Sequence, residues 1–137
     1  MDEPAVEVAP HVVRDVLDHA LATVPDECCG ILIGPDPDHI TRSVRTENVH
    51  PEPRTRYEVD PAAIAAAMED AVKADGDVVG FYHSHPRGWP RFSAEDEARA
   101  TWEGGLYVLV CLQPLAFVAA HWREGSFVPC EVRVPSR

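Results

Sequence analysis

Short apolar runs, each bounded by glycine, proline or charged residues, recur along the chain and constrain its fold more than any other feature. Runs of this length are typical of buried β-strands and are too short for most core helices. They predict strands at 28–34, 78–83, 106–112, 117–122 and 127–134. A strand at 39–49 would follow the turn at 35–38 and form a hairpin with the first of these strands, and 57–60 would be a short extended segment.

Apolar residues at helical spacing mark three further segments between these strands. They predict helices at 10–24, 61–75 and 93–103. Pro25, Gly76 and the pair Gly104-Gly105 would end the helices, and Ser93 has the right type and place for an N-cap. Because helices and strands alternate irregularly, we expect an α/β fold, a mixed β-sheet flanked by helices in two or three layers, as one domain over 1–137.

Charge and apolar patterning exclude several classes of function. The chain has 23 acidic and 12 basic residues, and a net charge of −11 argues against binding to a nucleic acid backbone. Its apolar stretches are far shorter than a membrane span, and its acidic start does not resemble a secretion signal. We therefore expect a cytoplasmic protein with no membrane partner.

Four cysteines are present, and none belongs to a C-x-x-C pair. They are expected to be small buried residues in a reducing compartment. Cys28 and Cys29 would point to opposite faces of one strand, because successive side chains alternate. A redox or thiol function at this pair is kept as a minor alternative.

The chemistry-bearing stretch begins at the end of the strand at 78–83. His83 and His85 are two residues apart, so a strand would direct both imidazoles to one face, and Asp96 returns in the first turn of a helix. Two imidazoles and one carboxylate form a common zinc ligand set that leaves a position for water. The pattern predicts a hydrolase with one zinc ion per chain. The remaining histidines show no paired spacing and are expected to be core or surface residues: His11, His19, His39, His50 and His121.

These residues resemble the JAMM motif of the MPN-plus metalloproteases. The motif here consists of Glu27, then His83-Ser84-His85-Pro86, then Ser93-x-x-Asp96. Similarity extends over about residues 10–122 and includes Pro25-x-Glu27-x-Cys29-Gly30, Asn48 and Tyr57-x-x-Asp60-Pro61. The resemblance implies a single MPN domain of the cytidine-deaminase-like type.

The resemblance also implies a role for each motif residue. His83, His85 and Asp96 would bind zinc, and Glu27 would take a proton from the attacking water and pass it to the leaving amine. Ser93 would donate a hydrogen bond to the oxyanion, and Ser84 would hold the ligands in place from behind. Without the family pattern, Glu27 would be read as a solvated charge and Ser93 as a helix cap alone.

Enzymes of this family remove ubiquitin or ubiquitin-like proteins from conjugates. The short, acidic, lysine-poor chain resembles an archaeal stand-alone member that cuts after the C-terminal Gly-Gly of a small modifier, in lysine conjugates or linear fusions. Arg56, Tyr57 and Trp89 lie in segments that would line a groove for this tail. Two alternatives stay open: a peptidase that trims a cysteine or peptide from the C-terminus of a sulfur-carrier protein, and a non-catalytic MPN scaffold.

Overall fold

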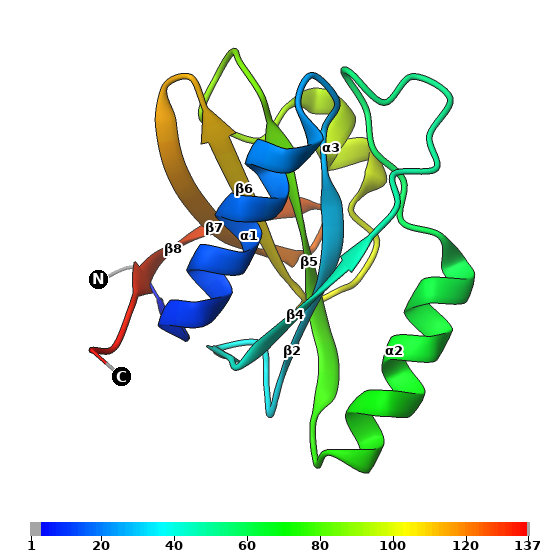
Figure 1. Ribbon diagram of the computed structural model, residues 1–137. Helices are drawn as coiled ribbons and strands as arrows, with labels where there is room; N and C mark the ends of the chain where they lie inside the picture. Colours follow the sequence, from blue (N-terminus) through cyan, green and yellow to red (C-terminus); the bar gives the residue numbers. More distant parts are fainter. Residues whose placement is uncertain (1–3, 137) are drawn as a thin grey trace.

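The computed structural model describes residues 4–136, so the ends of the expected domain, at 1–3 and 137, lie outside the described residues. Within these described residues, eight strands and three helices follow one another (Figure 1). In order they are β1 Ala5–Val8, α1 Pro10–Thr23, β2 Cys29–Gly34, β3 His39–Ile40, β4 Arg42–Thr46, α2 Pro61–Lys73, β5 Asp77–His85, α3 Ala94–Arg99, β6 Leu106–Leu112, β7 Leu115–Arg123 and β8 Ser126–Arg133. None of the helices within 4–136 is long and apolar enough to cross a membrane.

All eight strands belong to one mixed sheet in the order β3-β1-β8-β7-β6-β5-β2-β4. β5 and β6 run parallel, as β1 does with both β8 and β3, and the other neighbours are antiparallel. The two ends of this order, β3 and β4, are separated only by Thr41, whose N–H donates to the carbonyl oxygen of Ile33 at 2.9 Å. The sheet therefore curls until its first and last strands meet.

Helices cover the two faces of the sheet centre, as the alternation along β2 requires. Leu32 faces α1 and packs with Val12 and Val16, whereas Ile31 and Ile33 face α2. Figure 1 shows α1 and α2 on opposite sides of β2 and β5. This confirms the expected mixed sheet flanked by helices, arranged at its centre in three layers.

The structure differs most from the elements expected from the sequence at three places. The first strand, β1, was not expected, because only Val6 and Val8 carry its alternating pattern. The strand expected at 39–49 breaks at Thr41, where the chain passes from one end of the sheet to the other, and ends at Thr46. The helix expected to reach Glu103 ends at Arg99.

The early end of α3 has a packing cause. Trp102 is drawn toward the sheet, where its ring meets the Phe81 ring edge-on at a centroid distance of 5.0 Å. The backbone N–H groups of Thr101 and Trp102 then donate to the Tyr107 hydroxyl, at 3.1 and 3.2 Å, instead of continuing the helix. Packing of one large, partly buried aromatic ring against the sheet thus outweighs the helical preference of the sequence.

Candidate metal and catalytic site

The end of β5 presents the two histidines of the motif. β5 extends through His85, two residues beyond the expected strand, and His83 and His85 lie on the same face with ring centroids 5.1 Å apart. His83 is fully buried, at 1 % exposure. His85 Nδ1 lies 3.1 Å from the carbonyl oxygen of Trp89, which leaves Nε2 to face the site.

Asp96 meets both imidazoles. Its Oδ1 lies 3.0 Å from His83 Nε2 and its Oδ2 lies 3.1 Å from His85 Nε2. The carboxylate is fixed by a capping box at the start of α3, in which Ser93 N–H donates to Asp96 Oδ2 at 2.8 Å and Asp96 N–H donates to Ser93 Oγ at 3.1 Å. Although burial opposes it, the two imidazoles hold the pKa of Asp96 well below its usual range.

Glu27 reaches the same point from the segment before β2. Its side chain is buried, at 5 % exposure, and Oε1 has no hydrogen-bond partner among residues 4–136. One ligand atom each from Glu27, His83 and His85 lies within 4.8 Å of the other two. Burial raises the pKa of Glu27 to about 8, and the neighbouring His85 opposes that shift only in part.

The donor set fits a zinc ion. His83 Nε2 is buried and, although it lies near Asp96, makes no hydrogen bond of acceptable geometry with any described residue. Tetrahedral zinc with bonds of about 2.0–2.1 Å separates its ligand atoms by roughly 3.3 Å. The contacts of 3.0 and 3.1 Å to Asp96 are close to that spacing. A buried imidazole nitrogen whose lone pair has no partner destabilises the fold. A cation bound between the imidazoles and the carboxylate would satisfy it.

Two neighbouring residues, Ser84 and Tyr57, hold residues of the site in position. Ser84 Oγ accepts the N–H of Cys28 at 2.8 Å, and so ties the end of β5 to the residue after Glu27. The ring of Tyr57 stacks on the His83 ring at a centroid distance of 4.2 Å and an interplanar angle of 15°. Tyr57 is only 7 % exposed, a position that does not favour the substrate contact expected from the sequence.

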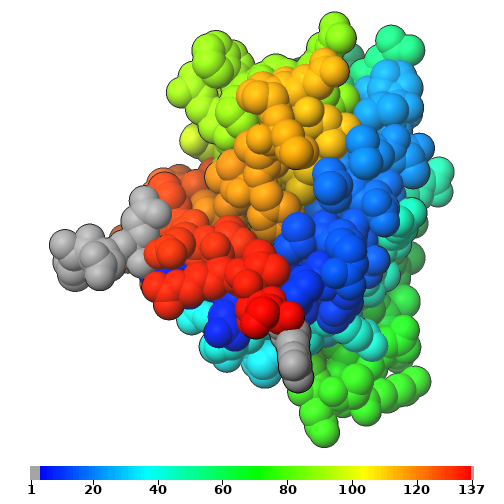
Figure 2. All heavy atoms as spheres, turned by 60° about the vertical axis from the view of Figure 1, so that its left-hand side comes forward, coloured from blue at the N-terminus to red at the C-terminus, as the bar shows by residue number. Residues whose placement is uncertain are grey.

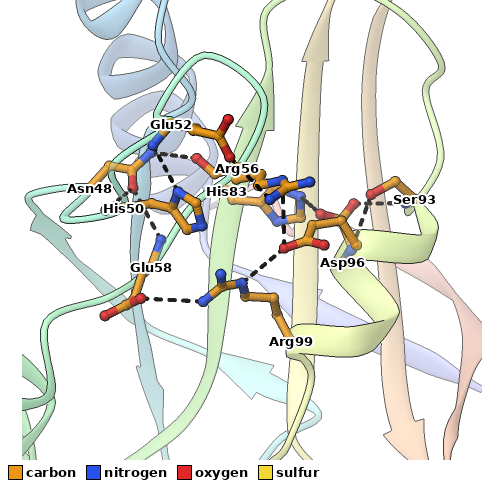
Figure 3. Close-up of polar contacts among 10 residues, drawn as sticks. Asn48, His50, Glu52, Arg56, Glu58, His83, Ser93, Asp96 and Arg99 are labelled. Carbon is orange, nitrogen blue, oxygen red and sulfur yellow. Dashed lines mark hydrogen bonds and ion pairs between the residues drawn. The ribbon is translucent and has the colours of Figure 1, made fainter.

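An ion-pair chain connects α3 to the loop at 47–60 (Figure 3). Arg99 contacts Glu58 at 3.3 Å and Glu95 at 3.2 Å, and Arg56 lies 3.9 Å from Glu95 and 3.1 Å from Glu52. The Arg56 side chain is therefore engaged by acids of the protein itself. These ion pairs were not expected from the sequence, because the two segments that they join, 52–58 and 95–99, are far apart in the sequence and follow no motif.

A groove of about 1,340 Å³ opens from Glu27 and His85 across the surface. It is bounded by the end of α1, part of the loop at 47–60, the loop at 85–94 and the β6–β7 turn; Figure 2 shows the end of α1, the green loop and the orange turn gathered at the top of the molecule. Trp89 lines it and is 70 % exposed, with the Arg91 guanidinium 4.8 Å from its ring centroid. The α1 and β6–β7 walls were not expected from the sequence. They contribute Leu17, Leu21, Val24, Leu112, Gln113 and Leu115.

The cysteines and the remaining histidines do not join the site. All four cysteines are buried and unbridged. Burial raises the pKa of Cys28 to about 12 and that of Cys29 to about 11, which argues against a reactive thiolate at either position. His19 and His121 are buried and contact Tyr82 and Asp38 respectively, as core residues do.

The chain resembles known proteins along nearly its whole length. The family model for prokaryotic homologs of the JAB domain matches residues 9–125. Desampylase from Haloferax volcanii is 35 % identical over 131 residues, which are 95 % of this chain and 94 % of that protein. A probable TtuB-protein conjugate cleaving protease from Thermus thermophilus is 33 % identical over 84 residues, 61 % of this chain and 55 % of that protein.

A solved structure shares the fold. The JAB1/MPN domain protein from Archaeoglobus fulgidus superposes with a TM-score of 0.62 at 21 % identity, covering 94 % of this chain and 98 % of that one. The MPN fold and the metallopeptidase class expected from the sequence are thereby confirmed. The chain belongs to the prokaryotic JAB-domain family, among the JAMM/MPN metalloproteases that its motif resembles.

Proposed function

We propose that the protein is a zinc-dependent isopeptidase that hydrolyses the bond after the C-terminal Gly-Gly of a ubiquitin-like modifier and releases the modifier from proteins or linear fusions. The observation that carries the proposal is the convergence of Glu27, His83, His85 and Asp96 at the end of one groove. The similarity to a desampylase and to a conjugate-cleaving protease supports the substrate class.

We assign His83, His85 and Asp96 as the zinc ligands and Glu27 as the proton carrier. Asp96 contacts both imidazoles, whereas Glu27 keeps a buried oxygen that has no hydrogen-bond partner among the described residues. When bound, zinc lowers the pKa of water to roughly 7 and polarises a carbonyl group.

Glu27 Oε1 takes the proton of the attacking water and gives it to the leaving lysine amine, so that the C–N bond breaks as the amine departs. A carboxyl group with a pKa near the working pH can both accept and return a proton. Burial already moves the pKa of Glu27 upward from its usual range.

Ser93 serves the helix and the reaction at once. Its Oγ accepts the N–H of Asp96, and the hydroxyl proton remains available to donate to the oxyanion that forms on the scissile carbonyl. The cap fixes the hydroxyl in position before substrate arrives.

The groove offers the modifier tail a path to these residues. Its walls include Arg54 and Thr55 on one side and Gly88 and Trp89 on another, close to the two segments expected from the sequence to bind the tail. Extended glycine residues need little width, and backbone pairing with a rim segment would supply binding.

Cytoplasmic location stays a prediction from the sequence.

The deciding experiment uses lysine conjugates of the host's own Gly-Gly-ended ubiquitin-like proteins. We expect the purified protein to release the modifier, to lose activity with a chelator and to regain it with zinc, and we expect the Glu27→Ala variant to be inactive. Parallel incubation with a sulfur-carrier protein ending in cysteine tests the trimming alternative. Activity that survives Glu27→Ala would exclude Glu27 as the proton carrier, whereas a wild-type protein that binds no zinc and releases no modifier would favour a scaffold.

A further inference from the structure

The amide side chain of Asn48 lies in the loop at 47–60, beside His50 and Glu58 (Figure 3). Each hydrogen bond that it makes with a described residue goes to a backbone group, either in this loop or at Glu27. Its Nδ2 donates to the carbonyl oxygens of Glu27 at 3.0 Å, Arg56 at 2.9 Å and Pro53 at 3.5 Å. Its Oδ1 accepts the N–H groups of His50 and Glu58, each at 3.1 Å. One side chain thus satisfies backbone groups from both ends of the loop.

The first of these bonds reaches the residue that we assign as the proton carrier. Glu27 precedes β2, so neither its N–H nor its C=O takes part in the sheet. Its N–H donates to Pro53 at 2.7 Å and its C=O accepts from Asn48. Both backbone groups of Glu27 are therefore held by the loop rather than by a strand.

The same amide also fixes the residue beneath a metal ligand. Asn48 bonds the carbonyl of Arg56 and the N–H of Glu58, the two neighbours of Tyr57. The Tyr57 ring in turn stacks on His83. Asn48 is thus the shared anchor of Glu27 on one side and of the Tyr57–His83 stack on the other.

We propose that Asn48 is a positioning residue that fixes Glu27 relative to the ligand His83. The inference rests on the proposed function, in which Glu27 carries the proton. A misplacement of about 1 Å in a catalytic group can lower the rate on the order of 100-fold. Asn48 does not itself line the groove, and its nearest link to the groove residues Arg54 and Thr55 is through the carbonyls of Pro53 and Arg56, so we expect its loss to lower kcat more than it raises KM.

The test compares Asn48→Asp and Asn48→Ala with the wild-type zinc enzyme. Aspartate has the same size and keeps the acceptor for His50 and Glu58, but it loses the donor to Glu27. We expect kcat on a Gly-Gly-ended lysine conjugate to fall at least about tenfold in both variants. KM should stay within about twofold, and each chain should still bind one zinc ion. In both variants, amide hydrogen exchange at Glu27 should become faster in NMR.

Two controls separate positioning from loss of stability. Val49→Ala changes the next side chain in the same loop but leaves the Asn48 amide intact. Val6→Ala removes buried volume from β1, away from the site, and should lower the melting temperature without lowering kcat.

The proposal is overturned if Asn48→Asp keeps wild-type kcat, or loses no more than Val6→Ala at an equal drop in melting temperature. An inactive wild-type enzyme would instead refute the proposed function. The exchange measurement does not depend on activity: unchanged protection of the Glu27 amide overturns the anchoring, and faster exchange supports it.

Discussion

Individual residues of the site differ in how far the sequence could place them. The i, i+2 spacing of His83 and His85 was sufficient to predict a shared face, because side chains alternate along any strand. The position of Asp96 could be predicted because Ser93, a residue typical of N-caps, marks the start of the helix that carries it. Glu27 had no such rule, since it comes from a different segment of the chain and only the family pattern indicated it. Tyr57 was read as a groove residue, because nothing local reveals that its ring lies beneath His83.

A first prediction concerns the Glu27 carboxylate. Glu27→Gln keeps the size of the side chain but removes its ability to take a proton, so kcat should fall about 10²- to 10⁴-fold. Zinc content, measured by elemental analysis, should stay at one ion per chain because the three proposed ligands are unchanged. A variant that keeps both zinc and full turnover would exclude Glu27 as the base.

A second prediction concerns the stability of the metal-free chain. The pKa of Glu27 rises from an ordinary value of 4.5 to about 8 on folding. The folded chain therefore binds more protons than the unfolded chain between these values, and its free energy of unfolding falls as pH rises through this window.

Chemical denaturation from pH 5 to pH 8 can measure this effect. Glu27→Gln should remove that part of the slope. The difference between the two proteins reports Glu27 together with its electrostatic coupling to His85, because both proteins retain His19 and His83, whose pKa values burial lowers. Parallel curves for the two proteins would contradict the assignment.

At the level of elements, apolar runs identified every long strand, since a run of five to eight apolar residues has few other stable uses in so short a segment. β1 could not be predicted from the sequence, because two valines are too few to form a recognisable strand pattern. The end of α3 could not be predicted either, because it depends on where Trp102 and Tyr107 meet in three dimensions. Long-range packing, rather than local preference, decided both cases.

A third prediction separates the two roles of Ser93 at the start of α3. Ser93→Ala removes the cap and should cost about 1 kcal/mol in the free energy of unfolding. Ser93→Asn should restore most of that stability, because asparagine is also a good N-cap. If the hydroxyl also donates to the oxyanion, Ser93→Ala should lose about 10²- to 10³-fold in kcat.

Thermal unfolding and turnover measured on the same samples check this. Full kcat in Ser93→Ala would show that Ser93 acts only as a cap.

At the level of the whole molecule, the groove contrasts with the rest of the surface. The chain carries a net charge of −11, yet Arg54, Arg87 and Arg91 line the groove, and Glu27 is the only carboxylate that lines it among residues 4–136. Leu115 and Trp89, 72 % and 70 % exposed, add apolar surface beside these cations. A basic, partly apolar surface on an acidic protein favours an acidic partner with an apolar face and directs its approach.

A fourth prediction follows from that contrast. The double variant Arg87→Glu, Arg91→Glu should lower kcat/KM for a full-length modifier conjugate by about tenfold at low salt, and the difference should shrink as ionic strength rises. Cleavage of a short Gly-Gly peptide substrate should change little.

The double variant Arg123→Glu, Arg133→Glu, at the ends of β7 and β8, serves as the control, because it changes the net charge by the same amount without touching the groove. An equal loss in the control would attribute the effect to net charge alone.

The pairing of β1 with β8 has a consequence for how the chain is made. Ala5 lies opposite Glu131 and Glu7 opposite Arg133, so β1 leaves the ribosome well before the strand that pairs with it. Contacts between such distant parts of a sequence form late and slowly. During translation the two apolar valines of β1 lack β8, and a chaperone that binds short extended segments would meet them there.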